Sequence, residues 1–499
     1  MRRWLTLAAV LTLLMGCLPA AAEGEPRNWY EVFVYSFRDS DGDGVGDLPG
    51  LEGKLDYIED MGFNGLWLMP VMPSPSYHKY DVTDYCAIDP QYGTLEDFKR
   101  LVQACHERDI RIVIDLPLNH TSTEHPWFVQ ACEALRAGET DNPYVDYYCF
   151  SQEVGGHAVA LPDTGWYYEE QFSGGHMPDL NLDSAAVRGE IEGILRFWLE
   201  ECGVDGFRLD AVTSYYAEDK ARNIDFLRTL KAETERISPG SYLVGECWKG
   251  LSDIAEYYES GIDGFFLFPA SQAEGYIAAS MRSKKPAATY VKHFKNVLAK
   301  IPMRNLAPFL SNHDTGRAVG SLRARSAPQN AKFGHGILAM MGGNTFTYYG
   351  EEIGMIGAGE DPNKRIGMYW RDGETTAPPP GATAAEYFFP DVEAQLADET
   401  SILRYVQALN RLKKAHPEIS GGENSFVYSD DFVCVMERTL DGAVSRVAIN
   451  FSAKEARTVE AAGWQIAGDL ETGTDRASMT DGVLTMPAYA IVILERANQ

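Results

Sequence analysis

Apolar runs of strand length alternate with segments of helical amphipathic spacing along most of this chain. The run Glu31–Phe37 precedes a segment, 50–62, whose apolar residues follow helical spacing and which ends in glycine. The run Gly65–Pro70 precedes the amphipathic segment 95–109, and a third run covers 110–120. Five later runs resume the alternation, at 204–211, 241–248, 262–268, 306–314 and 344–352. Eight strands joined in this way predict an α/β fold, a (β/α)8 TIM barrel with parallel strands inside and helices outside.

The alternation is interrupted in two places. Residues 120–178, after the third strand, are rich in Gly, Asp, Tyr and Trp and have no long periodic helix beyond their start, which is typical of a functional loop or a small inserted domain. From about residue 421, short alternating runs separated by turn residues predict an antiparallel β-sandwich. We therefore expect, in chain order, a signal peptide (1–22), the first part of the barrel (27–119), an inserted domain B (120–178), the second part of the barrel (179–418) and a C-terminal β domain (419–499).

The composition indicates a globular protein with an acidic surface. Of the 499 residues, 45% are hydrophobic and 23% are charged, so two or three domains with a large core can form. The formal net charge of -28 argues against a nucleic-acid or anionic-membrane partner and leaves neutral glycans open. A well-solvated surface alone is a sufficient explanation of this acidic balance.

The first residues have the pattern of an export signal. Two arginines precede the apolar run Trp4–Met15, which is too short to span a membrane and has the length of a signal h-region. Two processing sites compete. The segment Leu14–Cys17 resembles a bacterial lipobox, which would leave Cys17 lipidated, whereas Ala20–Ala22 offers an ordinary cleavage site. We expect a secreted or cell-surface protein, either lipid-anchored or released.

The cysteines give little further information. Of the eight cysteines, seven remain when Cys17 is set aside, so at least one is unpaired in a monomer. Cys132 and Cys149 flank a loop-rich stretch, and either a disulfide between them or two free thiols fits the sequence. The sequence has no CxxC motif or Cys/His cluster that would indicate zinc.

Three carboxylates follow apolar runs in widely separated segments. Asp210 lies in GFRLDA, Glu246 in LVGECW and Asp314 in FLSNHD. A barrel brings the C-terminal ends of its strands together on one face, where these acids would meet. Hydrolysis of a glycosidic bond needs one carboxylate as nucleophile and one carboxylic acid as proton donor. Taken singly, each acid has a simpler explanation as a capping or packing residue.

Strand alternation places Arg208 on the same face as Asp210. A neighbouring arginine favours the ionised form of a carboxyl group, which a nucleophile needs, although a purely structural ion pair would look the same in the sequence. Glu246 ends an apolar run, and a partly dry site raises the pKa of a carboxyl group toward that of a general acid.

The segments DLPLNH, GFRLDA, GECW and SNHD resemble, in order and spacing, four signature regions of the α-amylase family, glycoside hydrolase family 13. MPDLN at 177–181 resembles a fifth region. The resemblance implies that Asp210 is the nucleophile, Glu246 the acid and base, and Asp314 a stabiliser of the transition state. It also implies substrate-binding roles for a further set of residues, namely His78, Tyr80, His120, Arg208 and His313. The implied reaction retains anomeric configuration.

An acidic loop, DSDGDGVGD, follows the first predicted strand. It supplies oxygen ligands at alternate positions, which suits Ca²⁺, in the order Asp39, Asp41, Asp43, the Val45 carbonyl and Asp47. The loop resembles the first nine positions of an EF-hand, but the twelfth position is Gly50 instead of glutamate, which argues against a calcium sensor. A solvated acidic turn is the other interpretation. The resemblance favours calcium, because this branch of the family often binds one ion after the first strand.

Two features bear on specificity. Thr213 and Ser214 stand where many endo-acting members have Lys-His. This difference puts in doubt whether this chain has the leaving-group contacts of those members and a second calcium site at Asn119. Met177 resembles the group intermediate between oligo-1,6-glucosidases and neopullulanases, and Ala211 resembles members that act on α-1,4 links.

We therefore expect a monomeric enzyme that hydrolyses α-1,4 links in starch, maltodextrins or related α-glucans. The alternatives are a neopullulanase, a cyclomaltodextrinase or a transglycosylating enzyme. Remote alternatives are a non-catalytic glycan-binding protein and a calcium-dependent surface interaction protein.

Overall fold

The computed structural model describes residues 25–172, 174–371, 373–383 and 386–497. The predicted signal peptide, with Cys17 and both processing sites, lies outside the described residues. None of the helices within the described ranges has the length and apolarity needed to cross a membrane.

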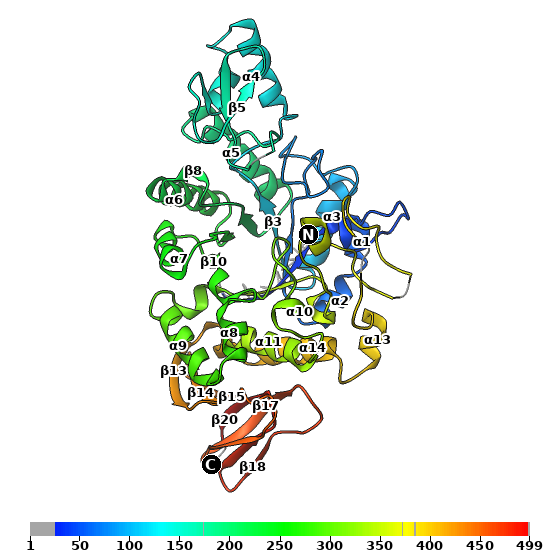
Figure 1. Ribbon diagram of the computed structural model, residues 1–499, viewed down its shortest axis with the longest axis vertical. Coiled ribbons are helices and arrows are strands. Elements are labelled where there is room, and N and C mark those ends of the chain that lie inside the picture. The colour runs from blue at the N-terminus through cyan, green and yellow to red at the C-terminus, as the bar shows by residue number, and fades with distance from the viewer. Residues whose placement is uncertain (1–24, 173, 372, 384–385, 498–499) are drawn as a thin grey trace, which may run out of the picture.

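The centre of the molecule is a ring of eight parallel strands (Figure 1). Their order in the sheet is β11-β10-β9-β7-β3-β2-β1-β12, and a parallel bridge between Phe309 and Phe346 joins the two ends. The predicted barrel is thus confirmed. The barrel strands are β1 (Asn28–Val32), β2 (Gly65–Leu68), β3 (Arg111–Leu116), β7 (Gly206–Leu209), β9 (Tyr242–Gly245), β10 (Gly264–Phe266), β11 (Leu306–Ala307) and β12 (Thr345–Tyr348).

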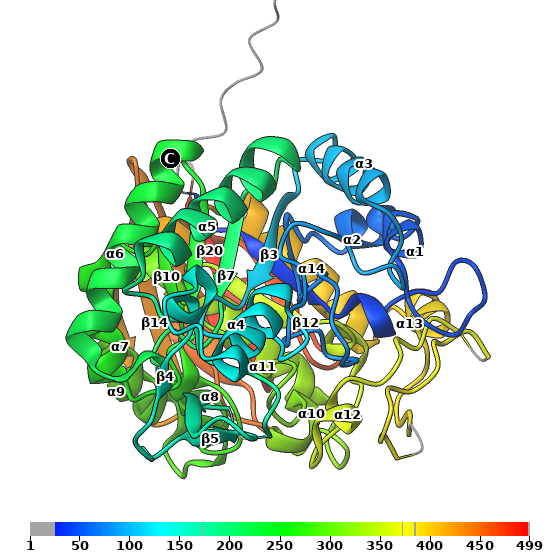
Figure 2. The ribbon, with the colours of Figure 1, turned by 90° about the horizontal axis from the view of Figure 1, so that it is seen from above.

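Helices surround the ring, as the view from above shows (Figure 2). The third helix begins with a reciprocal capping box between Thr94 and Asp97, which satisfies two backbone N–H groups. The helices of this layer are α1 (Leu48–Glu52), α2 (Leu55–Asp60), α3 (Leu95–His106), α5 (Ala185–Arg196), α6 (Lys220–Ile237), α7 (Leu251–Tyr257), α8 (Tyr276–Arg282), α9 (Pro286–Leu298), α10 (Ala318–Ser321), α11 (Gln329–Met340), α12 (Asp361–Lys364), α13 (Val392–Ala397), α14 (Ile402–Ala415) and α15 (Glu418–Gly421).

Aromatic rings fill the interior of the barrel. Trp29 stacks between Tyr242 and Phe346, with ring centroids 5.0 and 5.7 Å away. Trp67 stacks on Phe266 at 5.1 Å. Gly65 is required beside this stack, because a Cβ atom there would lie 2.5 Å from the ring of Trp29. This packing fixes the heights of the strands and therefore the positions of the residues that follow them.

The stretch after β3 folds over the face of the barrel where its strands end (Figure 1). It contains α4 (Pro126–Ala137) and a small antiparallel sheet of order β4-β6-β5. The strands of this sheet are β4 (Phe150–Ser151), β5 (Ala158–Leu161) and β6 (Trp166–Glu169). A further strand, β8 (Tyr215–Glu218), follows β7 later in the chain and is not part of this sheet. A bridge between His120 and Asp179 brings the two ends of the stretch together. Cys132 and Cys149 are both free thiols, so the disulfide alternative is wrong.

The C-terminal strands form two antiparallel sheets that share a core, as expected for a sandwich. The larger sheet has the order β13-β14-β15-β20-β17 and the smaller β16-β19-β18. Arg438 of β14 is fully buried and donates from Nη2 to the carbonyl of Met340 at the end of α11, which ties this unit to the barrel. The strands are β13 (Glu423–Ser429), β14 (Val433–Leu440), β15 (Ala443–Asn450), β16 (Arg457–Glu460), β17 (Trp464–Glu471), β18 (Ser478–Thr480), β19 (Val483–Met486) and β20 (Ala490–Arg496).

The first strand begins and ends earlier than predicted. The apolar run suggested Glu31–Phe37, but β1 covers Asn28–Val32 and a 3-10 turn covers Val34–Ser36. Both segments are fully buried, so hydrophobicity continues past the point where the strand ends. Periodicity cannot separate two buried conformations that follow one another directly.

Lys413 of α14 provides a test of the packing at the bottom of the barrel. Its side chain is 3% exposed, and its ammonium group donates to Thr345 Oγ1 (2.9 Å) and to the carbonyl of Gly343 (3.5 Å), without a salt bridge among the described residues. Burial therefore lowers its pKa to about 7. We expect Lys413→Met to raise the free energy of unfolding at pH 6 by about 1–4 kcal/mol, because it removes an unpaired buried charge.

The difference in the free energy of unfolding between Lys413→Met and the wild type should shrink as the pH rises from 7 to 10. In this window the unfolded lysine still binds a proton that the folded one has lost, so the stability of the wild type rises with pH. Thermal unfolding at pH 6 and pH 9 measures the effect. Lys414→Met, at the next and exposed position of the helix, is the matched control. A lower melting temperature of Lys413→Met at pH 6 would show that the charge is compensated.

Candidate active site

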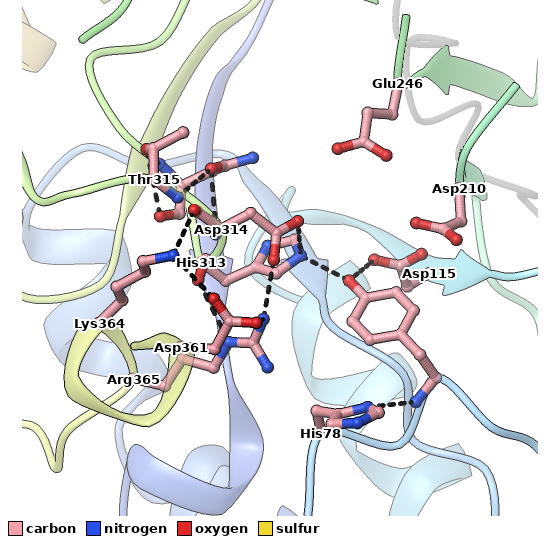
Figure 3. Close-up of polar contacts among 12 residues, drawn as sticks. His78, Asp115, Asp210, Glu246, His313, Asp314, Thr315, Asp361, Lys364 and Arg365 are labelled. Carbon is pink, nitrogen blue, oxygen red and sulfur yellow. Dashed lines mark hydrogen bonds and ion pairs between the residues drawn. The ribbon is translucent and has the colours of Figure 1, made fainter. Parts of the chain in front are cut away.

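The three predicted acids meet at the C-terminal ends of the barrel strands. Asp210 directly follows β7, Glu246 directly follows β9, and Asp314 lies on the segment after β11. Asp210 and Glu246 are each 8% exposed. In Figure 3 their carboxyl groups point into the same space, with Asp314 beside it. The structure thus brings together acids that are spread over about a hundred residues of the sequence.

Arg208 is the cation at the centre of this group. It is completely buried, and its Nη1 donates to Asp115 Oδ1 (2.8 Å) and to Asp210 Oδ1. Its Nη2 lies 3.1 Å from Glu246 Oε2, an ion-pair distance without hydrogen-bond geometry. Burial opposes the charge of Arg208, but the surrounding acids hold its pKa well above the usual range. One guanidinium therefore links the two acids that the reaction needs.

Glu246 has the properties of a general acid. Burial raises its pKa to about 7, Arg208 opposes this shift and Asp210 adds to it. The backbone N–H of Ala211 donates to Glu246 Oε2 (3.3 Å), and Ala211 has a φ of 46°, in the left-handed region. That conformation is costly for alanine, and here it turns the N–H of the residue after Asp210 toward the acid. A proton on Glu246 is therefore available near neutral pH.

Asp314 lies between two cations. Its Oδ2 is 3.0 Å from His313 Nε2, and its Oδ1 accepts from Arg365 Nη2 (2.7 Å). Burial raises the pKa of Asp314, but His313 and Arg365 outweigh burial and hold it well below the usual range. Lys364 donates to the backbone carbonyl of Asp314 (2.7 Å). Asp314 is thus a fixed carboxylate at the edge of the space that Asp210 and Glu246 face (Figure 3).

The predicted sugar-binding side chains lie around these acids. Tyr80 donates to Asp115 Oδ2 (3.0 Å) and stacks on His313, with ring centroids 5.6 Å apart. His78 accepts from the backbone N–H of Tyr80 (3.2 Å), and burial lowers its pKa to about 4, so it is a neutral ring. Tyr80 and His313 join the acids directly, and His78 joins them through Tyr80.

His120 stands apart from this network. Its ring is buried, and neither ring nitrogen meets hydrogen-bond geometry with any described residue. Burial lowers its pKa, and its ring lies 5.3 Å from that of Phe172. Buried polar atoms without partners call for an explanation, and a ligand hydroxyl would supply one. Asn119, next to it, donates to Asp179 Oδ1 (2.9 Å).

Sequence reasoning missed three residues of the site. Asp115 is the first residue of the DLPLNH segment, and it is fully buried against Arg208. Glu31 accepts from His313, and it could have been noticed as the one acid in an apolar strand. Arg365 comes from the loop after β12, and nothing in its local sequence indicates that it reaches Asp314.

The acidic loop brings three of its carboxylates together. Ligand oxygens of Asp39, Asp41 and Asp43 lie within 4.8 Å of one another. Asp47 lies apart from this cluster: its Oδ1 accepts from Gly50 and caps α1. The same Oδ1 also accepts from the hydroxyl of Ser40, and Oδ2 accepts from the backbone N–H of Ser40, so only Oδ2 retains a lone pair for a metal ion. The donor set of hard oxygens fits a calcium ion.

This chain is similar to several known proteins. The family model described as "Alpha amylase, catalytic domain" matches residues 31–422. "Alpha-amylase 3" of Dictyoglomus thermophilum is 43% identical over 350 residues, which cover 69% of this chain and 67% of that protein. "Oligo-1,6-glucosidase" of Parageobacillus thermoglucosidasius is 29% identical over 531 residues, covering 85% and 90%. The solved structure of Eubacterium rectale Amy13B superimposes with a TM-score of 0.91 at 42% identity over 96% of both chains.

Arg208→Met tests the role of the buried cation. Without Arg208, the pKa values of the neighbouring carboxyl groups rise further above those of the unfolded chain, so the folded state binds extra protons. A folded pKa above the unfolded value means that stability is lost as pH rises between the two. We expect a loss of about 3–5 kcal/mol at pH 8 and a smaller loss at pH 5.

Thermal unfolding at both pH values measures this difference. Arg438→Met is the matched control, because Arg438 is also fully buried but has no salt bridge among the described residues. Its loss of stability should not change between pH 5 and pH 8. An equal dependence on pH in both variants would contradict the central role of Arg208.

Proposed function

This chain belongs to the alpha-amylase family and is a glycoside hydrolase, and from that premise we propose that it hydrolyses α-1,4-glucosidic bonds with retention of anomeric configuration. The observation that carries the proposal is the pair Asp210 and Glu246 on one buried guanidinium. One acid lies in a hydrogen bond with the cation, and the other has a pKa raised to about 7. A retaining glycosidase needs one carboxylate as nucleophile and one carboxylic acid as proton donor.

In the proposed reaction, Asp210 attacks the anomeric carbon while the bond to the leaving oxygen breaks. Glu246 transfers its proton to that oxygen, so the leaving sugar departs as an alcohol. Glu246, now a carboxylate, then takes a proton from water, and the resulting hydroxide attacks the anomeric carbon and releases Asp210. The short contact of both acids with Arg208 supports this reaction, because one cation can balance the charge as it passes from one acid to the other.

Asp314, His313, Tyr80 and His120 are proposed to bind the sugar whose bond is cleaved. Asp314 is a carboxylate at the edge of the site, and a fixed negative charge favours the positive charge that develops on the sugar ring. The unpartnered ring nitrogens of His120 suit sugar hydroxyls. Tyr80 is partly exposed and held by two hydrogen bonds, as a stacking platform requires.

The preference for α-1,4 links is the finer part of the proposal. It is supported by the similarity to "Alpha-amylase 3" at 43% identity, compared with 29% to "Oligo-1,6-glucosidase". Starch, maltodextrins and related α-glucans are the proposed substrates. Neopullulanase, cyclomaltodextrinase and transglycosylating activities are the second candidates. They are favoured by the intermediate character of the MPDLN segment, and the products from starch, pullulan and cyclodextrin distinguish them.

Calcium is proposed as a structural ion in the acidic loop. The clustered side chains of Asp39, Asp41 and Asp43, with the Val45 carbonyl and Asp47, would supply the oxygen ligands. The ion would relieve repulsion among carboxylates that have no cationic side chain in salt-bridge contact among the described residues. Export with cleavage at Cys17 or after Ala22 is proposed from the sequence alone, and the intact mass of the mature protein decides between the two sites.

Substitution of the two acids tests the reaction. We expect Asp210→Asn to abolish hydrolysis of maltooligosaccharides, because it removes the nucleophile. Glu246→Gln should lower kcat by about 10²–10⁴-fold on the same substrates. It should lower kcat much less on α-glucosyl fluoride, whose leaving group needs no proton. Initial rates with both substrates measure the two effects.

Asp84→Asn, at an exposed carboxylate, is the control and should keep wild-type rates. Equal hydrolysis by the wild type and Asp210→Asn would disprove the assignment of the nucleophile. An equal loss on both substrates in Glu246→Gln would disprove its role as the proton donor.

Removal of calcium tests the loop. An ion that binds only the folded state stabilises it by about 2.7 kcal/mol when its free concentration is 100 times Kd. We therefore expect chelator-treated protein to melt at a lower temperature and added CaCl₂ to restore it. Asp41→Asn should need more Ca²⁺ for the same recovery, whereas Asp84→Asn should respond like the wild type. A melting temperature that does not change with Ca²⁺ in the wild type would rule out the site.

A further inference from the structure

Glu31 is a buried carboxylate that the proposed reaction does not use. It lies on β1 (Asn28–Val32), all of whose residues are buried, and it is 1% exposed. Its Oε1 lies 2.6 Å from His313 Nδ1 and also accepts from the backbone N–H of His313 (3.4 Å). Because burying a charge is costly, a carboxylate at this depth requires a strong partner. The imidazole of His313 is that partner.

The other side of the His313 ring also faces oxygen atoms. Its Nε2 lies 3.0 Å from Asp314 Oδ2 and 2.7 Å from the hydroxyl of Tyr80. Tyr80 gives its own proton to Asp115 Oδ2, at 3.0 Å, so its oxygen remains free to accept. Figure 3 shows the ring of His313 beside the carboxylate of Asp314. Both ring nitrogens of His313 are therefore placed against acceptors.

The number of protons on the ring follows from these contacts. A neutral imidazole carries one N–H, and its second nitrogen presents a lone pair. In a neutral His313 that lone pair would face either Glu31 or Asp314, both of which are acceptors when ionised. With Glu31 and Asp314 both ionised, only an imidazolium, with a proton on each nitrogen, satisfies all of the contacts together.

We propose that Glu31 is a positioning residue that keeps His313 as an imidazolium, so that Nε2 holds Asp314 and Tyr80 beside the sugar that is cleaved. The contacts then form a continuous chain from Glu31 through His313, Tyr80 and Asp115 to Arg208. The inference rests on the proposed function, because it takes Asp314 and Tyr80 to contact that sugar.

The electrostatic surroundings of His313 support the inference. Burial lowers the pKa of His313, but Asp314 and Glu31 outweigh burial and raise it to about 10. Arg365 contacts the backbone carbonyl of His313 through Nε (3.2 Å), and Trp67 of β2 meets the ring edge to face at 5.8 Å. Loss of the charge on Glu31 would remove one of the two anions that hold the second proton.

The wild-type protein itself offers the first test. Nitrogen NMR of ¹⁵N-histidine-labelled protein at pH 9 distinguishes neutral rings from imidazolium rings. A histidine with an ordinary pKa of about 6.5 is neutral at this pH. One of the ten histidines is expected to keep both ring protons, and its signal should be lost in Glu31→Gln. A wild-type spectrum without an imidazolium at pH 9 would overturn the inference, whether or not any variant folds.

Kinetics provide the second test. Without the carboxylate of Glu31 the imidazolium should form only at acid pH, so Glu31→Gln should have a kcat/KM on maltooligosaccharides about 10²-fold below the wild type at pH 8. The ratio of the variant to the wild type should rise about tenfold or more on going to pH 5, as acid returns the proton to His313. A merely structural role would lower the ratio equally at every pH, and a flat ratio would overturn the inference.

Two further variants complete the experiment. Glu31→Asp keeps the negative charge, so its ratio to the wild type should not change with pH, even if its kcat/KM is lower. Glu352→Gln alters another fully buried acid, one that accepts from Tyr30 and Tyr57 and has no contact with His313. Its ratio should also be flat. If the ratio for Glu31→Gln does not change with pH, the role of Glu31 is rejected. If the wild type is active and Asp210→Asn is inactive in the same experiment, the proposed function still holds.

Discussion

The chemistry at the mouth of this barrel depends on one buried cation. The guanidinium of Arg208 lies against Asp115, Asp210 and Glu246, and no part of its side chain reaches solvent. Three acids at this distance in a dry site would repel one another and take up protons. The single positive charge of Arg208 opposes this effect, and burial still raises the pKa values of Asp115 and Glu246 to about 7. The raised pKa of Glu246 thus comes from its burial, and the positive charge of Arg208 limits the rise.

A rigid frame is needed to maintain this difference. The stacked rings of Trp29, Tyr242 and Phe346 fill the barrel and fix the strand ends. The frame also tolerates costly backbone conformations, since Ala211 beside the nucleophile and Lys79 beside Tyr80 both have positive φ. Such residues persist only where the surrounding packing determines their conformation. The rigid packing inside the barrel therefore fixes the positions of the site residues at the C-terminal ends of the strands.

Charge is arranged differently inside and outside the molecule. The sequence as a whole has a formal net charge of -28, an excess of acidic over basic side chains. Inside, the acids of the site are matched by Arg208, Arg365 and His313. These cations come from three different strand ends, so the balance forms only when the barrel closes. Folding and the assembly of the proposed site are therefore a single event.

The sequence by itself determined the class of fold and most of the candidate site. Hydrophobic alternation located all eight barrel strands, and the motifs around Asp210, Glu246 and Asp314 pointed to one face, because strand ends must meet there. Local pattern was insufficient where two buried conformations adjoin, as at the end of β1. Only the tertiary structure decided that Glu31 reaches His313 and that Arg365 reaches Asp314. Those pairs join residues far apart in the chain, and their energies depend on burial and distance, which exist only once the barrel has formed.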